Sequence, residues 1–112
     1  MTTLPAVTDR DFDRAIEKAT RPVLMEFRRP GCGHCHALMV ELEAVQRETG
    51  AALQIVTMNV EENFQVPAEM EIQSLPALAL YREGRSERFI GGIGTKKHIL
   101  NALGLPVSDS SG

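Results

Sequence analysis

The chain has 112 residues, enough for one domain with a hydrophobic core, and its 43% hydrophobic and 24% charged residues are ordinary for a globular protein. A net charge of -3 argues against nucleic-acid binding, which depends on clustered positive charge. Residues 1–10 lack the apolar segment of a signal peptide, and no apolar run approaches the length of a membrane span. We therefore expect a cytoplasmic protein with no nucleic-acid or membrane partner.

Helical and strand patterns alternate through the first half of the chain. Thr8 and Asp11 have the spacing of a capping box before a helical apolar stripe, and Gly50 is suited to end a longer helix. The expected elements are an edge strand over residues 4–7, a helix over 12–19, a buried strand over 23–27, a helix over 33–49 and a strand over 53–60. The outer face of the long helix is interpreted as a solvated surface; it carries Glu41, Glu43, Gln46, Arg47 and Glu48.

The second half of the chain predicts a hairpin followed by a helix. A short helix is expected near Pro67, and a strand begins at Pro76, where the missing N–H leaves no ladder bond unmade. Glu83 and Gly84 form a tight turn into a strand over residues 86–90. Thr95 is expected to cap the last helix. We expect one domain over residues 1–105 and a disordered tail over residues 106–112.

The two cysteines, Cys32 and Cys35, lie where the buried strand turns into the long helix. Cysteines at this spacing can form a disulfide, bind a metal or attach haem, but their place in a strand-helix-strand unit favours redox chemistry. Unpaired N–H groups at a helix start stabilise a thiolate by roughly 0.3–1 kcal/mol, so further help is needed. His34, Arg28 and Arg29 are the candidates to supply it.

Glu26 interrupts the buried strand before the cysteines. An unpaired carboxylate in such a strand is costly, so its pKa should be raised. Glu26 either lies in water at a sheet edge or accepts and donates the proton of Cys35, directly or through a water. The strand direction favours the second interpretation, because Glu26 is near the end that leads into the cysteines.

Two cofactor interpretations compete with the redox one. Cys32 through His36 matches the CxxCH pattern of haem attachment, with His36 as axial ligand. That interpretation leaves the preceding strand and Pro76 unexplained. A zinc site requires four ligands, and the chain has no second CxxC or suitably spaced histidine pair. We therefore expect no metal and no cofactor apart from a redox-active cysteine pair.

The order of elements around one CxxC resembles the thioredoxin family over roughly residues 4–105. The features that match in order and spacing are Glu26, Cys32-Gly33-His34-Cys35, Leu75-Pro76, Gly84 and Gly92. The resemblance implies an α/β thioredoxin fold, in which about four helices flank a central mixed β-sheet of four to five strands.

The resemblance also implies an activity and a set of site residues. The protein would be a monomeric thiol/disulfide oxidoreductase that reduces or exchanges disulfides of protein substrates. A reductase or dithiol electron donor would then reduce its own disulfide again. Cys32 would be the exposed nucleophile and Cys35 the buried resolving thiol. Pro76 would be a cis-proline in the substrate-binding surface, together with Gly31, Leu75 and Gly92.

Several positions depart from the family pattern. Gly33-His34 resembles the dipeptide of protein disulfide isomerases, and a histidine there favours the reduced thiolate, so we expect a weaker reductant than thioredoxin. Arg28 and Gly31 replace aromatic residues, and Thr57 replaces a lysine. These changes alter the surface that meets partners and favour one dedicated partner. The alternative is a thioredoxin-fold binding or chaperone module in which the cysteines are not essential.

Overall fold

The computed structural model describes residues 4–90 and 95–104, except for the side chain of Arg88, and all structural statements concern these residues. In chain order the elements are α1 (Phe12–Glu17), β1 (Val23–Arg28), α2 (Gly33–Thr49), a 3-10 turn (Gly50–Ala52), β2 (Gln54–Asn59), α3 (Gln65–Glu69), β3 (Ala77–Arg82), β4 (Arg85–Ile90) and α4 (Lys96–Leu103). No helix in these ranges is long and apolar enough to cross a membrane.

The four strands form one mixed sheet in the order β2-β1-β3-β4. Strand β1 is parallel to β2 and antiparallel to β3, and β3 and β4 form the expected hairpin. The edge strand expected over residues 4–7 is reduced to a single parallel bridge between Ala6 and Thr57. Thr57 donates its N–H to the carbonyl of Pro5 and accepts the N–H of Val7. Pro5 thus contributes only an acceptor, which is all that a proline backbone has to offer.

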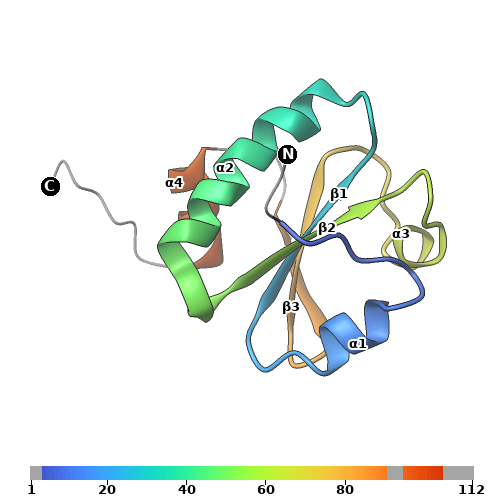
Figure 1. Ribbon diagram of the computed structural model, residues 1–112, viewed down its shortest axis with the longest axis horizontal. Helices are drawn as coiled ribbons and strands as arrows, with labels where there is room; N and C mark the ends of the chain where they lie inside the picture. The colour runs from blue at the N-terminus through green and yellow to red at the C-terminus, as the bar shows by residue number, and fades with distance from the viewer. Residues whose placement is uncertain (1–3, 91–94, 105–112) are drawn as a thin grey trace, which may run out of the picture.

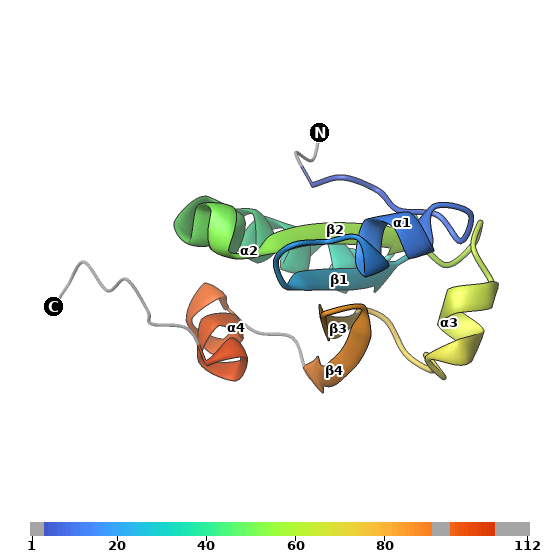
Figure 2. The ribbon, with the colours of Figure 1, turned by 90° about the horizontal axis from the view of Figure 1, so that it is seen from below.

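Two hydrophobic layers cover the sheet. Helices α2 and α4 pack on one face against Leu24, Ile55 and Leu80, whereas α1 and α3 cover the other face, which carries Met25 and Val56. Figure 1 shows the two pairs of helices on opposite sides of the strands, and Figure 2 gives the order of the strands from a second direction. Because side chains alternate along a strand, the residues two positions apart on β1 share a face.

The helix boundaries follow local signals, with one helix shorter than expected. Helix α2 begins and ends where the sequence predicts, and its C-cap Gly50 has a φ of 55°. Thr8 and Asp11 form the reciprocal hydrogen bonds of a capping box. Residues 8–11 form a turn, Asp11 is the N-cap, and α1 begins at Phe12 as expected. The helix ends at Glu17, two residues earlier than expected. The N–H of Ala19 donates to the carbonyl of Ile16, three residues back, so the chain leaves the α-helix in a 3-10-like turn.

The turn and the cap expected in the second half of the chain are present. Glu83 and Gly84 connect β3 to β4, both with a left-handed φ, 55° and 79°, as a tight hairpin turn requires. Thr95 is the N-cap of α4 and accepts the N–H of His98. Gly92 and the tail predicted over residues 106–112 lie outside the described residues.

The interpretation of the outer face of α2 as only a solvated surface is wrong for three of its residues. The side chain of Gln46 bonds to the backbone around the start of β2. Glu41 accepts the backbone N–H of Lys96, and Glu48 forms a salt bridge with the ammonium of the same lysine. These contacts fix the start of α4 against α2.

Candidate active site

The two cysteines meet at the N-terminus of α2, directly after β1. Cys32 is the N-cap residue, with extended backbone angles, and Cys35 lies in the first turn of the helix. The two residues form a disulfide, with their Cα atoms 5.2 Å apart. The sulfur of Cys32 also accepts the backbone N–H of Cys35 at 3.1 Å. A backbone donor is therefore already directed at this sulfur in the oxidised protein.

The two sulfurs differ in exposure. Cys32 is half-buried, whereas Cys35 is completely buried. Gly31, Gly33 and His34 around them are exposed. Gly31 has a φ of +80°, a conformation that side chains rarely adopt, so a larger residue there would strain the turn that presents Cys32. The geometry leaves one cysteine open to a partner and the other shielded.

Glu26 is buried within the sheet, not placed in water at an edge. Its side chain is completely buried, and neither carboxylate oxygen has a hydrogen-bond partner among the described residues. Burial raises the pKa of Glu26 from 4.5 to about 7, while the positive charge of Arg28 acts in the opposite direction. Its neighbours across the sheet are Thr57 on β2 and Leu78 on β3. Glu26 lies two residues from Leu24 and therefore faces the layer that contains α2.

The three cationic candidates near the cysteines occupy different environments. Arg28, the last residue of β1, is half-buried, and its Nε atom is buried without a hydrogen-bond partner among the described residues. Arg29 and His34 are exposed. All three flank the loop that carries Cys32, so each adds positive charge to the neighbourhood of a thiolate when it is protonated.

Pro76 lies at the same end of the sheet as the cysteines. The Leu75-Pro76 peptide bond is cis, as the resemblance implied, and both residues are half-buried. Strand β3 starts at Ala77, which pairs with Phe27 near the end of β1. Because the two strands are antiparallel, the start of β3 is beside the end of β1 from which the cysteine loop leaves.

A pocket of about 500 Å³ adjoins Pro76. Its apolar side chains include Met70, Ile72 and Phe89, and Phe89 is 51% exposed. Phe89 was not among the site residues predicted from the sequence. The available signal was an aromatic residue that follows four polar residues of β4, and only the pairing with Ala79 in the sheet places it near this pocket.

No group of three or more histidine, cysteine, aspartate or glutamate side chains that could hold a metal ion occurs in the described part of the chain. His36, the histidine considered as a haem ligand, and His98 are exposed on different helices. Both cysteine sulfurs are engaged in the disulfide. The chemistry that this arrangement supports is the making and breaking of that bond.

Comparison with known proteins assigns the family. A family model described as Thioredoxin matches residues 3–104. The chain belongs to the thioredoxin family. It is 32% identical to a thioredoxin of Streptomyces clavuligerus over 103 residues, which cover 92% of this chain and 95% of that protein. It is 28% identical to a thioredoxin of Rickettsia felis over 95 residues, or 85% of this chain and 90% of the relative.

Family membership and the cysteine pair together establish the general activity. The protein is a thiol/disulfide oxidoreductase with a redox-active CxxC pair, and the α/β thioredoxin fold predicted from the sequence is confirmed. The family acts on disulfide-containing proteins and depends on a reductase, so both kinds of partner are expected here in general terms.

Proposed function

We propose that Cys32 is the attacking thiol and Cys35 the resolving thiol of this oxidoreductase. The Cys32 thiolate attacks a substrate disulfide, which forms a mixed disulfide and releases one substrate thiolate. The Cys35 thiolate then attacks the sulfur of Cys32. This step forms the intramolecular disulfide and releases the second substrate thiolate, so two electrons pass to the substrate. The difference in exposure between the two cysteines is the observation that carries this assignment.

The start of α2 supports the thiolate of Cys32. The N–H of Cys35 is directed at the sulfur of Cys32, and the helix dipole adds stabilisation of roughly 0.3–1 kcal/mol. Gly33 leaves the first helical turn free of side-chain bulk, and His34 and Arg28 add positive charge when protonated. A stabilised thiolate makes the disulfide more oxidising, so the protein should be a weaker reductant than thioredoxin.

Glu26 is assigned the proton of Cys35. A buried thiol does not ionise readily, and a nearby base removes this obstacle. The support is that Glu26 is buried on the face of the sheet covered by α2, with no hydrogen-bond partner among the described residues and a pKa of about 7. A carboxyl group with this pKa can both accept and return a proton near neutral pH.

The substrate side of the site is assigned to the loop at Gly31, the Leu75-Pro76 step and Gly92. The support from this structure is that Pro76 and the cysteines lie at the same end of the sheet and that a partly apolar pocket adjoins Pro76. The replacement of aromatic residues by Arg28 and Gly31 favours a dedicated protein partner. A cytoplasmic location, a monomeric state and independence from any other cofactor remain predictions.

The direct test is a redox titration of the wild-type protein in glutathione buffers, followed by thiol trapping and intact mass. We expect one two-electron transition between dithiol and disulfide, with a tenfold change in the ratio for about 30 mV, at a potential above the thioredoxin value of about -270 mV. Cys32→Ser should abolish both the transition and disulfide reduction. Cys35→Ser should instead accumulate a mixed disulfide on Cys32.

Two results would contradict the proposal. A mixed disulfide that accumulates on Cys35 in the Cys32→Ser protein would reverse the two roles. If Cys32→Ser replaced the wild type in the cell without loss of the protein's cellular function, the alternative would be favoured, a binding or chaperone module in which the cysteines are not essential.

A further inference from the structure

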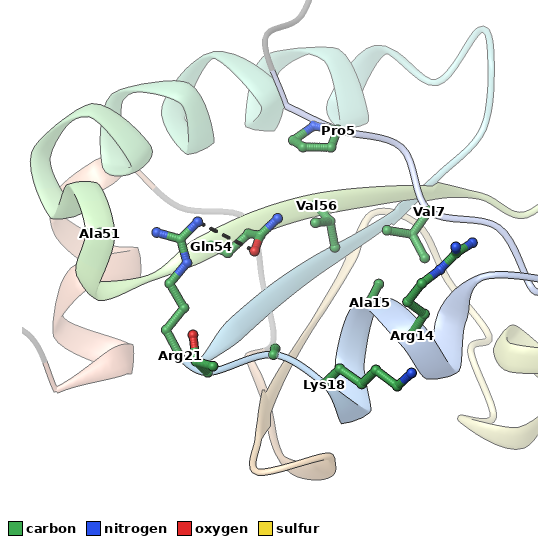
Figure 3. A pocket seen from close by; sticks show the side chains of 11 residues that line it. Pro5, Val7, Arg14, Ala15, Lys18, Arg21, Ala51, Gln54 and Val56 are labelled. Atoms are coloured by element: carbon green, nitrogen blue, oxygen red, sulfur yellow. Dashed lines mark hydrogen bonds between the residues drawn. The ribbon is translucent and has the colours of Figure 1, made fainter.

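A pocket of about 720 Å³ opens on the α1 side of the sheet, beside the edge strand β2. Figure 3 shows its side chains, which come from the N-terminal segment, α1, the connection to β1, the 3-10 turn and β2. Val7 and Val56 form its apolar base, and both are buried, with 6% and 1% of their surface exposed. The pocket is separate from the one that adjoins Pro76.

The charged side chains that line this pocket are all positive: Arg14, Lys18 and Arg21. Arg14 is on α1, and Lys18, the C-cap residue of that helix, follows it by four residues. Figure 3 shows Arg21 on the other side of the pocket, where it donates to the side-chain oxygen of Gln54 at 3.5 Å. No aspartate or glutamate is among the described lining residues. This local excess of positive charge is opposite in sign to the net charge of -3 of the whole chain.

None of these three cations forms a salt bridge within the described part of the chain. Its two salt bridges involve Arg82 and Lys96. Arg14 does interact with Asp11, whose pKa is lowered chiefly by its hydrogen bonds to Thr8 and further by the positive charge of Arg14. Asp11 is itself held by Thr8, so its carboxylate serves the turn before α1. The pocket therefore offers positive charge beside apolar surface.

Backbone groups at the neighbouring edge of β2 are already paired. The N–H of Ile55 donates to the side-chain oxygen of Gln46, and both backbone groups of Thr57 bond to the N-terminal segment. A ligand therefore has little opportunity to bind by adding a strand at this edge. It must be recognised through its own side chains, by the cations and by the accessible apolar side chains of Pro5 and Ala15.

We propose that this pocket binds an acidic segment of a partner protein, in which an apolar side chain separates the carboxylates. The apolar side chain packs above the base of the pocket against Pro5 and Ala15, while carboxylates on either side meet Arg21 and the α1 cations. A peptide fits better than a small anion because the cations border opposite sides of an apolar base. Charge complementarity thus specifies the occupant.

The position of the pocket separates this binding from the redox chemistry. Arg21 precedes β1 and Gln54 begins the parallel strand β2, whereas Cys32 follows the other end of β1. Six strand residues span about 20 Å, at about 3.3 Å per residue. A partner held at the pocket leaves Cys32 accessible. The proposal therefore goes beyond the oxidoreductase function and does not depend on the roles assigned to the cysteines.

The test uses the full-length oxidised protein and a fluorescein-labelled peptide of sequence Gly-Ser-Glu-Val-Glu-Leu-Glu-Ser-Gly, with binding followed by fluorescence anisotropy. We expect saturable binding that weakens as salt is added. Lys18→Glu and Arg21→Glu should each weaken binding about tenfold. Lys97→Glu, an equal charge change at an exposed position of α4, should leave the affinity unchanged.

Two control peptides distinguish the contributions, and a midpoint in the glutathione titration equal to that of the wild type verifies that each variant keeps the folded active site. Replacement of the three glutamates by glutamine should abolish binding, and replacement of valine and leucine by serine should weaken it. The proposal is overturned if no variant-sensitive binding is found at millimolar peptide. It is equally overturned if the serine peptide binds as tightly as the original and Lys97→Glu weakens binding as much as Arg21→Glu, because binding would then be general charge attraction.

Discussion

Gln46 and Glu26 are two polar side chains beside the same sheet, but the structure treats them in opposite ways. The amide of Gln46 donates to the carbonyls of Leu53 and Gly50 and accepts the N–H of Ile55. The bonds to Leu53 and Ile55 are each 2.8 Å long. The carboxylate of Glu26 is completely buried and has no such partner among the described residues. The polar atoms of Gln46 are therefore hydrogen-bonded, whereas those of Glu26 are not.

The difference separates a structural role from a chemical one. A buried polar group that is hydrogen-bonded stabilises the fold, whereas an unpaired one costs free energy and shifts its own pKa. Gln46 acts in place of a neighbouring strand, because its amide pairs with one donor and one acceptor at the edge of β2. Glu26 lacks this compensation, and its raised pKa is the property that suits it to proton transfer with Cys35.

Glu26→Gln should have the largest effect, on the rate at which the mixed disulfide is resolved. Removal of a general base costs about 100-fold or more. In the wild-type protein the rate should rise with pH through about 7, as Glu26 ionises and can accept the proton. The measurement is stopped-flow release of a thiol from a preformed mixed disulfide on Cys32, between pH 5 and pH 9.

The matched control for the rate is Glu61→Gln, which removes an exposed carboxylate. It should retain both the rate and the pH profile. If Glu26→Gln kept the inflection near pH 7, the group that accepts the proton would have to be another residue.

The second prediction concerns the stability of the oxidised protein, in which neither cysteine titrates. The pKa of Glu26 is about 7 in the folded protein against 4.5 as the reference value, so the folded state binds the proton more tightly. Below pH 4.5 Glu26 is protonated in both the folded and the unfolded protein, so its burial does not require the loss of a charge from water. As pH rises from 4.5 to about 7 the unfolded state ionises first, and stability falls by an amount on the order of 3 kcal/mol.

Urea unfolding at a series of pH values tests this loss of stability. The difference in the free energy of unfolding between the wild type and Glu26→Gln should fall as the pH rises, because all other titrating groups are common to both proteins. Thr57→Lys sharpens the comparison, because it places an ammonium on the strand position paired with Glu26. It should lower the pKa of Glu26 by about 1–3 units and narrow the pH range over which stability is lost. A difference that stays constant from pH 4 to pH 8 would contradict the raised pKa.

Local patterns in the sequence were sufficient to predict the frame of the site. The apolar run before the cysteines and the helical spacing after them place Cys32 at the junction of β1 and α2, as the structure confirms. The Glu83-Gly84 turn and the Thr95 cap were also predicted, because each depends on residues next to one another in the chain. Glu26 was noted because a charge in an apolar run conflicts with burial.

Features that depend on distant residues were not predictable in the same way. Arg14, Lys18 and Arg21 look like ordinary surface charges, and only the packing of α1 against β2 gathers them around one pocket. Gln46 was interpreted as a solvated residue, because its partners Leu53 and Ile55 meet it only after the chain has turned from α2 into β2. A periodic pattern identifies a face of a helix but does not identify which edge of a sheet that face meets.

Gln46→Ala should have the smallest of these effects, a pH-independent loss of about 2 kcal/mol in the free energy of unfolding, because the N–H of Ile55 and the carbonyl of Leu53 lose their partner. Gln46→Glu keeps the acceptor for Ile55 but loses the donor to Leu53, so it should be destabilising at pH 7 and partly recover when the carboxyl is protonated. Gln73→Ala, at an exposed position, is the matched control and should change little. If Gln46→Ala were as stable as Gln73→Ala, water would replace the amide at this edge without loss, and the contrast between Gln46 and Glu26 would no longer depend on hydrogen bonding.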